Sequence, residues 1–168
     1  MESQADVCIY MDVDLATDLA SFPRMVECVQ RGESDLAVGS RLLHGSFVKR
    51  SWGREVLSRG YNRLVRHSFG TRFSDAQCGF KAVSRRVVQE ILPQVKDEAW
   101  FFDTELLTIS EKQGFRIFDQ PVKWIDDDDS RVKIVSTAWE DIKGVLRVRM
   151  YLWSGEHRVR SRDQRARA

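Results

Sequence analysis

Short apolar runs alternate with longer amphipathic segments along most of this chain, and this alternation limits the folds that it can adopt. Predicted strands, each short and apolar, span residues 7–11, 36–39, 78–83 and 117–124. Predicted helices, with apolar residues at helical spacing, span residues 22–30, 54–69, 85–92, 102–113 and 136–152. The apolar face expected on the helix at 54–69 consists of Leu57, Tyr61, Leu64, Val65 and Phe69. Strands that alternate with helices predict an α/β fold, in which a sheet lies between layers of helices.

Residues that begin or end helices support these boundaries. Pro23 stands in the first turn of its helix, where a proline is tolerated. Asp103 is placed to cap the helix at 102–113. Gly70 and Gly114 are placed to end helices, and Pro93 to end the helix that begins at residue 85.

The length of 168 residues predicts one domain with a proper core. No apolar run is long enough to span a bilayer, and the acidic, polar N-terminus does not look like a secretory signal. The three cysteines, Cys8, Cys28 and Cys78, are widely spaced and odd in number. They predict free thiols in a reducing compartment rather than a disulfide framework or a zinc site.

The net charge of +2 is unremarkable, but the charges are unevenly distributed. An acidic run occupies residues 126–129, and seven arginines follow from residue 147 to residue 167. Such a basic end can bind polyanions, either membrane lipids or nucleic acid, or can be a disordered solubilising tail. It lacks interleaved aromatic residues for base stacking, so we expect no nucleic-acid partner.

Two carboxylates follow the first predicted strand, in the stretch YMDVDLATD. On a regular strand, residues two apart point the same way, so Asp12 and Asp14 are expected to share a face. Ligands of α/β sheets bind beyond the carboxyl ends of the strands, which is where this pair lies. A solvated acidic loop remains the alternative.

Basic residues follow the second predicted strand and continue into the next helix. Arg41 closes the strand and can project over its carboxyl edge. Arg54 and Ser58 share a helix face, with Arg59 adjacent, and offer cations and a hydroxyl to an anion. The alternative is that these arginines are ordinary surface charges.

Further polar groups precede the third strand and open a later helix. Asp75 and Gln77 lie in DAQCGFK, and Asp103 and Glu105 lie in WFFDTELL behind aromatic residues. Taken singly, each of these residues has a structural explanation, such as a helix cap. Their order and spacing indicate a functional site.

Six motifs in this order resemble the polyprenyl-phosphate glycosyltransferases of glycosyltransferase family 2, which include dolichyl-phosphate glucosyl- and mannosyltransferases. They are YMDVDLATD, GSR, RxxxSR, DAQCGFK, WFFDTELL and PVKWIDDDDSRVK. The resemblance runs from about Val7 to about Arg149, and DAQCGFK followed by WFFDTELL is its most specific part. It implies a GT-A fold, a Rossmann-like three-layer α/β/α sandwich.

The resemblance also implies roles for single residues. Asp12 and Asp14 match the pair that binds Mg²⁺ or Mn²⁺ on the donor diphosphate. Asp75 and Gln77 match the segment that lines the sugar and is expected to be catalytic, together with Asp103.

The expected substrate-binding residues are Arg41, Arg54, Ser58, Arg59 and Arg131. Among them, Arg54, Ser58 and Arg59 resemble the acceptor-phosphate site, and Arg131 matches the basic residue of an acceptor loop.

The implied reaction moves a hexose from a nucleotide diphosphate sugar to a polyprenyl phosphate, with inversion. UDP-glucose is the favoured donor and GDP-mannose the next. We expect three parts: a GT-A domain at 1–135, an amphipathic helix at 136–153, and a basic, disordered tail at 154–168. The helix offers an apolar face of Trp139, Ile142, Val145, Leu146 and Leu152, with Lys143, Arg147 and Arg149 as cations. The helix and tail would hold the protein peripherally at the cytoplasmic face of a membrane.

Two departures from the family pattern stand out. Family members carry a base-binding half before the metal-binding carboxylates, and here Met1 lies only a few residues before them. We therefore expect an N-terminally truncated fold, with a non-catalytic binding or membrane-associated module as the alternative. Ala16 stands where many mannosyltransferase-like members carry a glutamine.

Overall fold

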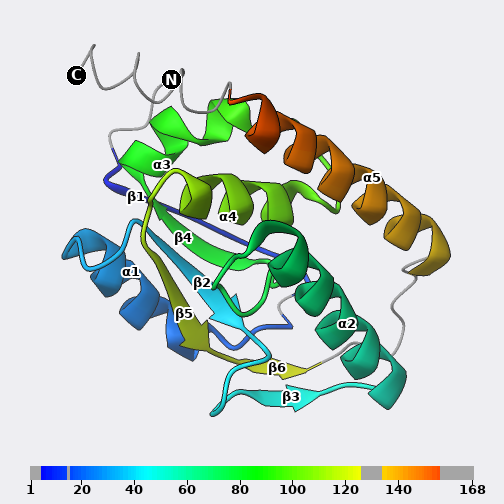
Figure 1. Ribbon diagram of the computed structural model, residues 1–168. Helices are drawn as coiled ribbons and strands as arrows, with labels where there is room; N and C mark the ends of the chain where they lie inside the picture. Colours follow the sequence, from blue (N-terminus) through cyan, green and yellow to red (C-terminus); the bar gives the residue numbers. More distant parts are fainter. Residues whose placement is uncertain (1–4, 15, 126–133, 156–168) are drawn as a thin grey trace.

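The computed structural model describes residues 5–14, 16–125 and 134–155. Its strands are β1 (Val7–Met11), β2 (Leu36–Ser40), β3 (Phe47–Lys49), β4 (Phe80–Ser84), β5 (Ile117–Pro121) and β6 (Lys123–Ile125). Four of them form the central sheet, in the order β1-β4-β2-β5 (Figure 1). β4 is antiparallel to both of its neighbours, whereas β2 and β5 are parallel. β3 and β6 form a separate two-stranded parallel sheet.

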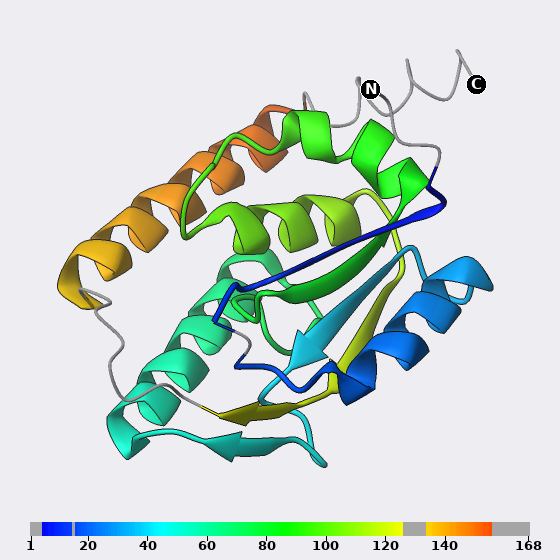
Figure 2. The ribbon, with the colours of Figure 1, turned by 180° about the vertical axis from the view of Figure 1, so that it is seen from behind.

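Helices cover both faces of the central sheet. They are α1 (Phe22–Gln30), α2 (Trp52–Phe69), α3 (Arg85–Glu90), α4 (Phe102–Lys112) and α5 (Ile134–Ser154). α1 lies on one face, and the reverse view shows α2, α4 and α5 on the other (Figure 2). The layered α/β architecture predicted from the sequence is confirmed.

The hydrophobic core has two layers, one on each face of the central sheet, and alternate residues of a strand contribute to different layers. On β2, Leu36 and Val38 join the cluster that includes α2, α4 and α5, whereas Ala37 joins the cluster under α1. On β4, Phe80 and Ala82 face α1. A period of two therefore divides each strand between the layers.

α4 is the most deeply enclosed helix. Seven consecutive residues, 104–110, are buried, because the sheet lies on one side of α4 and α5 on the other (Figure 2). This run includes the polar side chains of Thr104, Thr108 and Ser110 as well as Glu105. Because α4 is enclosed, the side chains of its first turn, Asp103 and Glu105, are held in fixed positions.

α5 packs on α4 through a close contact and an ion-pair network. A Cβ atom on Gly144 would overlap the ring of Phe101, so only glycine lets the helix approach this closely. Nη2 of Arg147 lies 2.7 Å from Oε2 of Glu105 and 3.1 Å from Oδ2 of Asp97. Because Glu105 is buried, this network anchors α5 to the core.

Most of the predicted boundaries agree with the structure. The strand at 7–11 and the helix at 22–30 coincide with β1 and α1. Gly70 ends α2 in the left-handed conformation, with φ of 61°, and its N–H donates to Arg66 O. The three cysteines form no disulfide.

Three local expectations are wrong. Asp103 does not cap α4: Phe101 is the N-cap, and Asp103 turns towards the sheet instead. Pro93 does not end α3, which stops at Glu90; the proline lies in a 3-10 turn at Leu92–Gln94. On α2, Leu57 and Leu64 are exposed, because the buried face of that helix is centred on Ser58, Asn62, Val65 and Phe69.

The proposed division of the chain stays a prediction. The expected helix at 136–152 lies within α5. The acidic run and all but two residues of the expected tail lie outside the described residues.

Gly144→Ala should destabilise the protein by about 1–3 kcal/mol, because the new methyl group must displace the Phe101 ring or the whole of α5. Gly60→Ala is the matched control, since it adds the same group to α2 with nothing within 4 Å. The control should stabilise by roughly 0.5–1 kcal/mol through helix propensity alone. Urea denaturation measures both, and equal shifts in the two variants would contradict the close contact.

Candidate active site

Asp12 and Asp14 lie just beyond the end of β1. The N–H of Asp12 donates to Gly79 O at 2.8 Å, and Oδ1 of Asp14 accepts from the N–H of Ala16 at 3.0 Å. The Asp12 carboxylate lies against Gly79, where a Cβ atom would overlap it. The glycine of DAQCGFK thus makes room for the first carboxylate of YMDVDLATD.

The expected reason for the pairing of these carboxylates is wrong. β1 ends at Met11, so strand periodicity does not place Asp12 and Asp14 on one face. They are nevertheless close enough for the charge of Asp14 to raise the pKa of Asp12.

Asp75 is completely buried and is bound by Arg41. Nε of Arg41 donates to Oδ2 at 2.8 Å and Nη2 to Oδ1 at 3.0 Å. The backbone N–H groups of Arg41 and Gln77 also donate to this carboxylate. Burial alone would raise the pKa of Asp75, but the Arg41 charge and these hydrogen bonds hold it below its ordinary value. Asp75 therefore fixes Arg41 at the carboxyl end of β2.

A second buried ion pair joins β4 to the start of α4. Nζ of Lys81 lies 2.9 Å from Oδ2 of Asp103, and the hydroxyl of Tyr10 donates to Oδ1 at 2.7 Å. Lys81 is fully buried and also donates to Cys78 O. The first turn of α4 is thus tied to the strand beside Asp12.

These two pairs leave Asp12 and Asp14 without an ion-pair partner among the described residues. Arg41 balances Asp75 and Lys81 balances Asp103, while no Lys or Arg among the described residues forms an ion pair with Asp12 or Asp14. The pKa of Asp12 is raised by burial, and further by the charges of Asp14 and Asp103, and the charges of Lys81 and Arg41 offset this rise only in part. The cluster therefore has an excess of negative charge that a cation would relieve.

This donor set fits a divalent cation shared with a phosphorylated ligand. Mg²⁺ is commonly held by one or two carboxylates together with phosphates and water. In the described part of the chain, no group of three or more His, Cys, Asp or Glu side chains forms a complete metal cage. Asp12 and Asp14 would hold the ion, and the ligand and water would complete its coordination.

The predicted acceptor residues are not brought into one cluster. Ser58 is buried in α2, whereas the side chain of Arg59 is 60% exposed and its Nε pairs with Glu55. The two residues lie on different faces because consecutive helical positions are about 100° apart. Arg54 lies near the start of the same helix, and Arg131 lies outside the described residues.

Two residues beside the site, Trp124 and Lys81, were given no role from the sequence. Arg50 is buried against Glu55, and both Arg41 and Arg50 lie over the ring of Trp124, at 5.4 and 5.9 Å. Lys81 is the only charged residue within the β4 sequence FKAVS, which is a signal that could have identified it.

Gln77 contacts α5, a helix that the sequence motifs do not connect with the site. Its Nε2 lies 3.4 Å from Oδ2 of Asp141, on α5. Burial raises the pKa of Asp141 to about 6.

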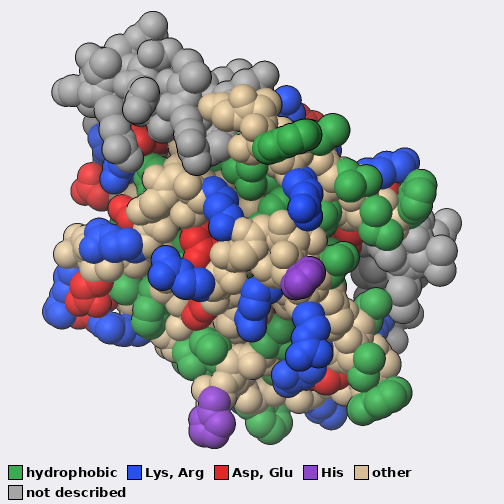
Figure 3. All heavy atoms as spheres, in the orientation of Figure 1, with side chains coloured by type: hydrophobic (Ala, Val, Ile, Leu, Met, Phe, Trp, Pro, Cys, Tyr) green, Lys and Arg blue, Asp and Glu red, His purple; other side chains and the backbone are tan. Residues whose placement is uncertain are grey.

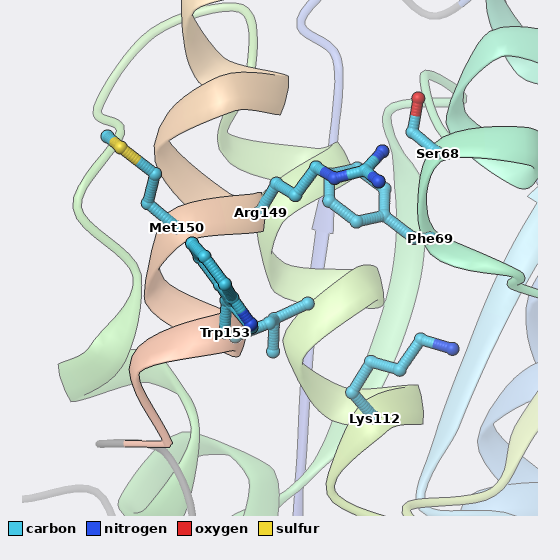
Figure 4. Close-up of a pocket in the computed structure, with 7 residues that line it drawn as sticks. Ser68, Phe69, Lys112, Arg149, Met150 and Trp153 are labelled. Carbon is cyan, nitrogen blue, oxygen red and sulfur yellow. The ribbon is translucent and has the colours of Figure 1, made fainter.

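A shallow groove separate from this cluster lies beside the end of α5 (Figure 4). Its volume is about 510 Å³. Its lining comes from the ends of three helices: Ser68 and Phe69 of α2, Lys112 of α4, and Arg149, Met150, Leu152 and Trp153 of α5. The groove combines two cations with apolar walls.

The outer face of α5 carries exposed apolar side chains at steps of three and four residues. They are Trp139, Ile142, Leu146, Met150 and Trp153, exposed by 43% to 92%. Hydrophobic and basic side chains lie next to one another on the surface that this helix helps to form (Figure 3). The expected membership of this face needs correction, because Val145 is buried and Arg147 pairs with Glu105. Among the described helices, none is long and apolar enough to cross a membrane.

Ligands of open α/β sheets bind beyond the carboxyl ends of the strands, where Asp12, Asp14 and Arg41 lie, and arginine is well suited to bind phosphate. Comparison with known proteins defines the class: the pattern of glycosyl transferase family 2 matches residues 1–92. The chain belongs to this family.

Several known proteins are similar to this chain over most of its length. Glycosyltransferase AglD of Haloferax volcanii is 41% identical over 133 residues, which is 79% of this chain and 21% of AglD. The dolichyl-phosphate beta-glucosyltransferase of Dictyostelium discoideum is 30% identical over 165 residues, 95% of this chain and 50% of the relative. The Saccharomyces cerevisiae enzyme of the same name is 27% identical over 164 residues, which is 89% of this chain and 49% of the relative. The chain thus spans about half the length of these glucosyltransferases and about a fifth of AglD.

Asp75→Asn should destabilise the protein by about 3–5 kcal/mol, because it leaves the Arg41 guanidinium largely buried without its counter-charge. Glu27→Gln is the control: it removes an exposed pair with Arg31 and should cost under about 1 kcal/mol.

The stabilisation by Asp75 should depend on pH, because its pKa is lower in the folded protein than its ordinary value of 3.8. The stabilisation is complete at pH values above 3.8 and is lost as the pH falls through the lower pKa of the folded state. The difference from wild type should therefore shrink in strong acid. Urea midpoints across pH test this, and a loss no larger than that of the control would contradict it.

Proposed function

We propose that this domain transfers a hexose from a nucleotide diphosphate sugar to a polyprenyl or dolichyl phosphate. The observation that carries the proposal is the Asp12–Asp14 pair, which forms no ion pair with any described Lys or Arg and lies near the fixed Arg41. Family membership and the names of the relatives support the reaction class. UDP-glucose is the favoured donor because several relatives are named as glucosyltransferases, with GDP-mannose next.

Asp12 and Asp14 are proposed to hold Mg²⁺ or Mn²⁺ against the donor diphosphate. When bound, the ion supplies Lewis-acid stabilisation of the departing diphosphate. Arg41 would add a rigid guanidinium on the same edge, because Asp75 holds its orientation through two parallel hydrogen bonds. The proposed contribution of Asp75 thus passes through Arg41, since its carboxylate has no exposed surface.

The remaining residues are proposed to orient the two substrates. Gln77 would line the sugar, and the Lys81–Asp103 pair would fix the floor of the site. The acceptor phosphate is largely ionised at neutral pH, since phosphate monoesters have a second pKa of about 6, and it can attack the anomeric carbon without a strong base. Attack opposite the departing diphosphate gives inversion. Ser58, Arg54, Arg59 and Arg131 remain the proposed acceptor-side residues.

A non-catalytic module is the second candidate. The observation that favours it is the exposed apolar stripe on α5, which suits a binding or membrane-associated module. The two candidates differ in ligand binding: a catalytic domain binds UDP-glucose in a metal-dependent way, and a non-catalytic module does not.

The proposed acceptor is a membrane lipid, so the protein is proposed to bind peripherally at the cytoplasmic face of a membrane. The exposed stripe of α5 ends in tryptophans at residues 139 and 153, a residue type enriched at membrane interfaces. Lys112 and Arg149 line the groove beside it (Figure 4) and are suited to an anionic headgroup.

Transfer is tested directly by incubating the chain with UDP-glucose, Mn²⁺ and a polyprenyl phosphate in detergent. Asp12→Asn should abolish both lipid-linked hexose formation and Mn²⁺-dependent UDP-glucose binding, because it removes a ligand of the proposed ion. Asp6→Asn, at an exposed carboxylate upstream, should leave both unchanged. Mass spectrometry and calorimetry are the measurements. Wild-type turnover in Asp12→Asn would refute the metal site, and no metal-dependent binding by wild type would favour the non-catalytic candidate.

Membrane binding is tested with vesicles that contain phosphatidylglycerol. The double substitution Leu146→Ser with Met150→Ser should weaken binding by about tenfold or more, through lost apolar burial. Leu19→Ser is the control, since Leu19 is similarly exposed but stands just before α1. Added salt should weaken binding by wild type. Co-sedimentation gives the affinities, and a double variant that binds as well as the control would exclude α5 as the contact face.

A further inference from the structure

Asp141 is an acidic residue on the inner face of α5, where its helix neighbours are apolar. It is 5% exposed, and Val145 and Val148, which follow it on the same face, are 7% and 0% exposed. A carboxylate at such a position costs free energy unless it is hydrogen-bonded or has a role. The fold gives Asp141 no cation to pair with among the described residues.

The carboxylate of Asp141 faces the loop that carries Asp75. Oδ2 lies 3.4 Å from Nε2 of Gln77, and the hydroxyl of Tyr61 also favours the charged form of Asp141 by hydrogen bonding. Tyr61 in turn lies 2.8 Å from Oγ1 of Thr104 on α4. Asp141 therefore connects α5 with α2, with α4 and with the DAQCGFK loop.

The other oxygen of Asp141, Oδ1, is buried and has no hydrogen-bond partner among the described residues. An orphaned buried carboxylate oxygen is uncommon and calls for an explanation. Gln77 lies at the border of the proposed sugar site and is only half-buried. A group on this border could therefore complete the network when a ligand is present.

α5 is held firmly enough to keep Asp141 in place. Gly144 lies against Phe101 one turn later, and Arg147 pairs with Glu105 and Asp97. Gln77 is fixed at its other end, because its backbone N–H donates to Oδ1 of Asp75. The glutamine is thus held between the two aspartates.

We propose that Asp141 is a positioning residue of the transfer site, which holds the Gln77 side chain so that its amide can bind the donor sugar. An amide that donates one N–H to Asp141 retains a second N–H and a carbonyl oxygen for sugar hydroxyls. This inference rests on the proposed function of the same site. It makes α5 part of the active site as well as an outer helix.

The protonation of Asp141 supports this role. Burial is the main reason that its pKa rises to about 6, with the charges of Asp97 and Glu140 adding to the shift, and Gln77 and Tyr61 opposing it. Above this pH the charged carboxylate is a strong acceptor for the Gln77 amide, and below it the neutral carboxyl is a weaker one. The order of Gln77 should therefore decrease as pH falls through 6.

The first experiment measures affinities for UDP-glucose and for UDP, both with Mn²⁺, by calorimetry at pH 7.5. Asp141→Asn should weaken UDP-glucose binding by about tenfold and leave UDP binding unchanged, because its neutral amide oxygen is a weaker acceptor for the Gln77 N–H and Gln77 acts on the sugar. Asp141→Glu should recover part of the loss. Glu140→Gln, at the exposed neighbouring residue of α5, is the matched control and should change neither affinity.

The second experiment needs no ligand. The side-chain amide signals of Gln77 in an NMR titration should shift with an apparent pKa near 6 in wild type and should be flat in Asp141→Asn. A flat wild-type titration would overturn the contact, and equal loss of UDP and UDP-glucose binding would indicate structural damage and overturn the positioning role. If wild type binds UDP-glucose and Asp141→Asn binds it equally well, the role of Asp141 is refuted and the proposed function of the site stands. If wild type shows no metal-dependent binding, the proposed function fails and the inference with it.

Discussion

The buried pair between Arg41 and Asp75 is the interaction on which the site depends. Asp75 has no contact with solvent, and both of its oxygens accept hydrogen bonds from Arg41. The pair joins the end of β2 to the loop before β4, which are far apart in sequence and belong to strands of opposite direction. Because neither charge can be buried alone, this loop and the strand end must adopt their positions together. The loop then brings Gly79 against Asp12 and Gln77 against α5.

A second constraint is the balance of charge around the sheet edge. Two of the four carboxylates are neutralised within the protein, Asp75 by Arg41 and Asp103 by Lys81. The fold thus concentrates its remaining negative charge on Asp12 and Asp14, where a cation and a phosphorylated ligand can approach. Burying the charge of Lys81 costs free energy, and its pairing with Asp103 explains why this lysine is tolerated in the core.

The secondary structure was largely predictable, because it depends on local spacing. β1 and α1 were placed correctly from a short apolar run and from an amphipathic helix with a proline in its first turn. Where the predictions failed, a partner distant in sequence was responsible. Asp103 has the residue type of a helix cap, but it lies inside the first turn of α4, and Lys81 and Tyr10 bind its carboxylate at the sheet. The exposure of Leu57 and Leu64 depends on which face of α2 meets the core, which helical spacing leaves open.

The sequence by itself determined the α/β class, the element order and the motifs that carry the site residues, since these depend on residue type and spacing along the chain. Only the tertiary structure decided which charges neutralise one another. It paired Asp75 with Arg41 across 34 residues and Tyr10 with Asp103 across 93, and it decided that the face of α2 with Ser58, rather than the face with Arg59, is buried. It also brought Asp141, 64 residues away in sequence, to Gln77. Electrostatic energy depends on distance and burial in space, and neither quantity is encoded in the spacing of residues along the chain.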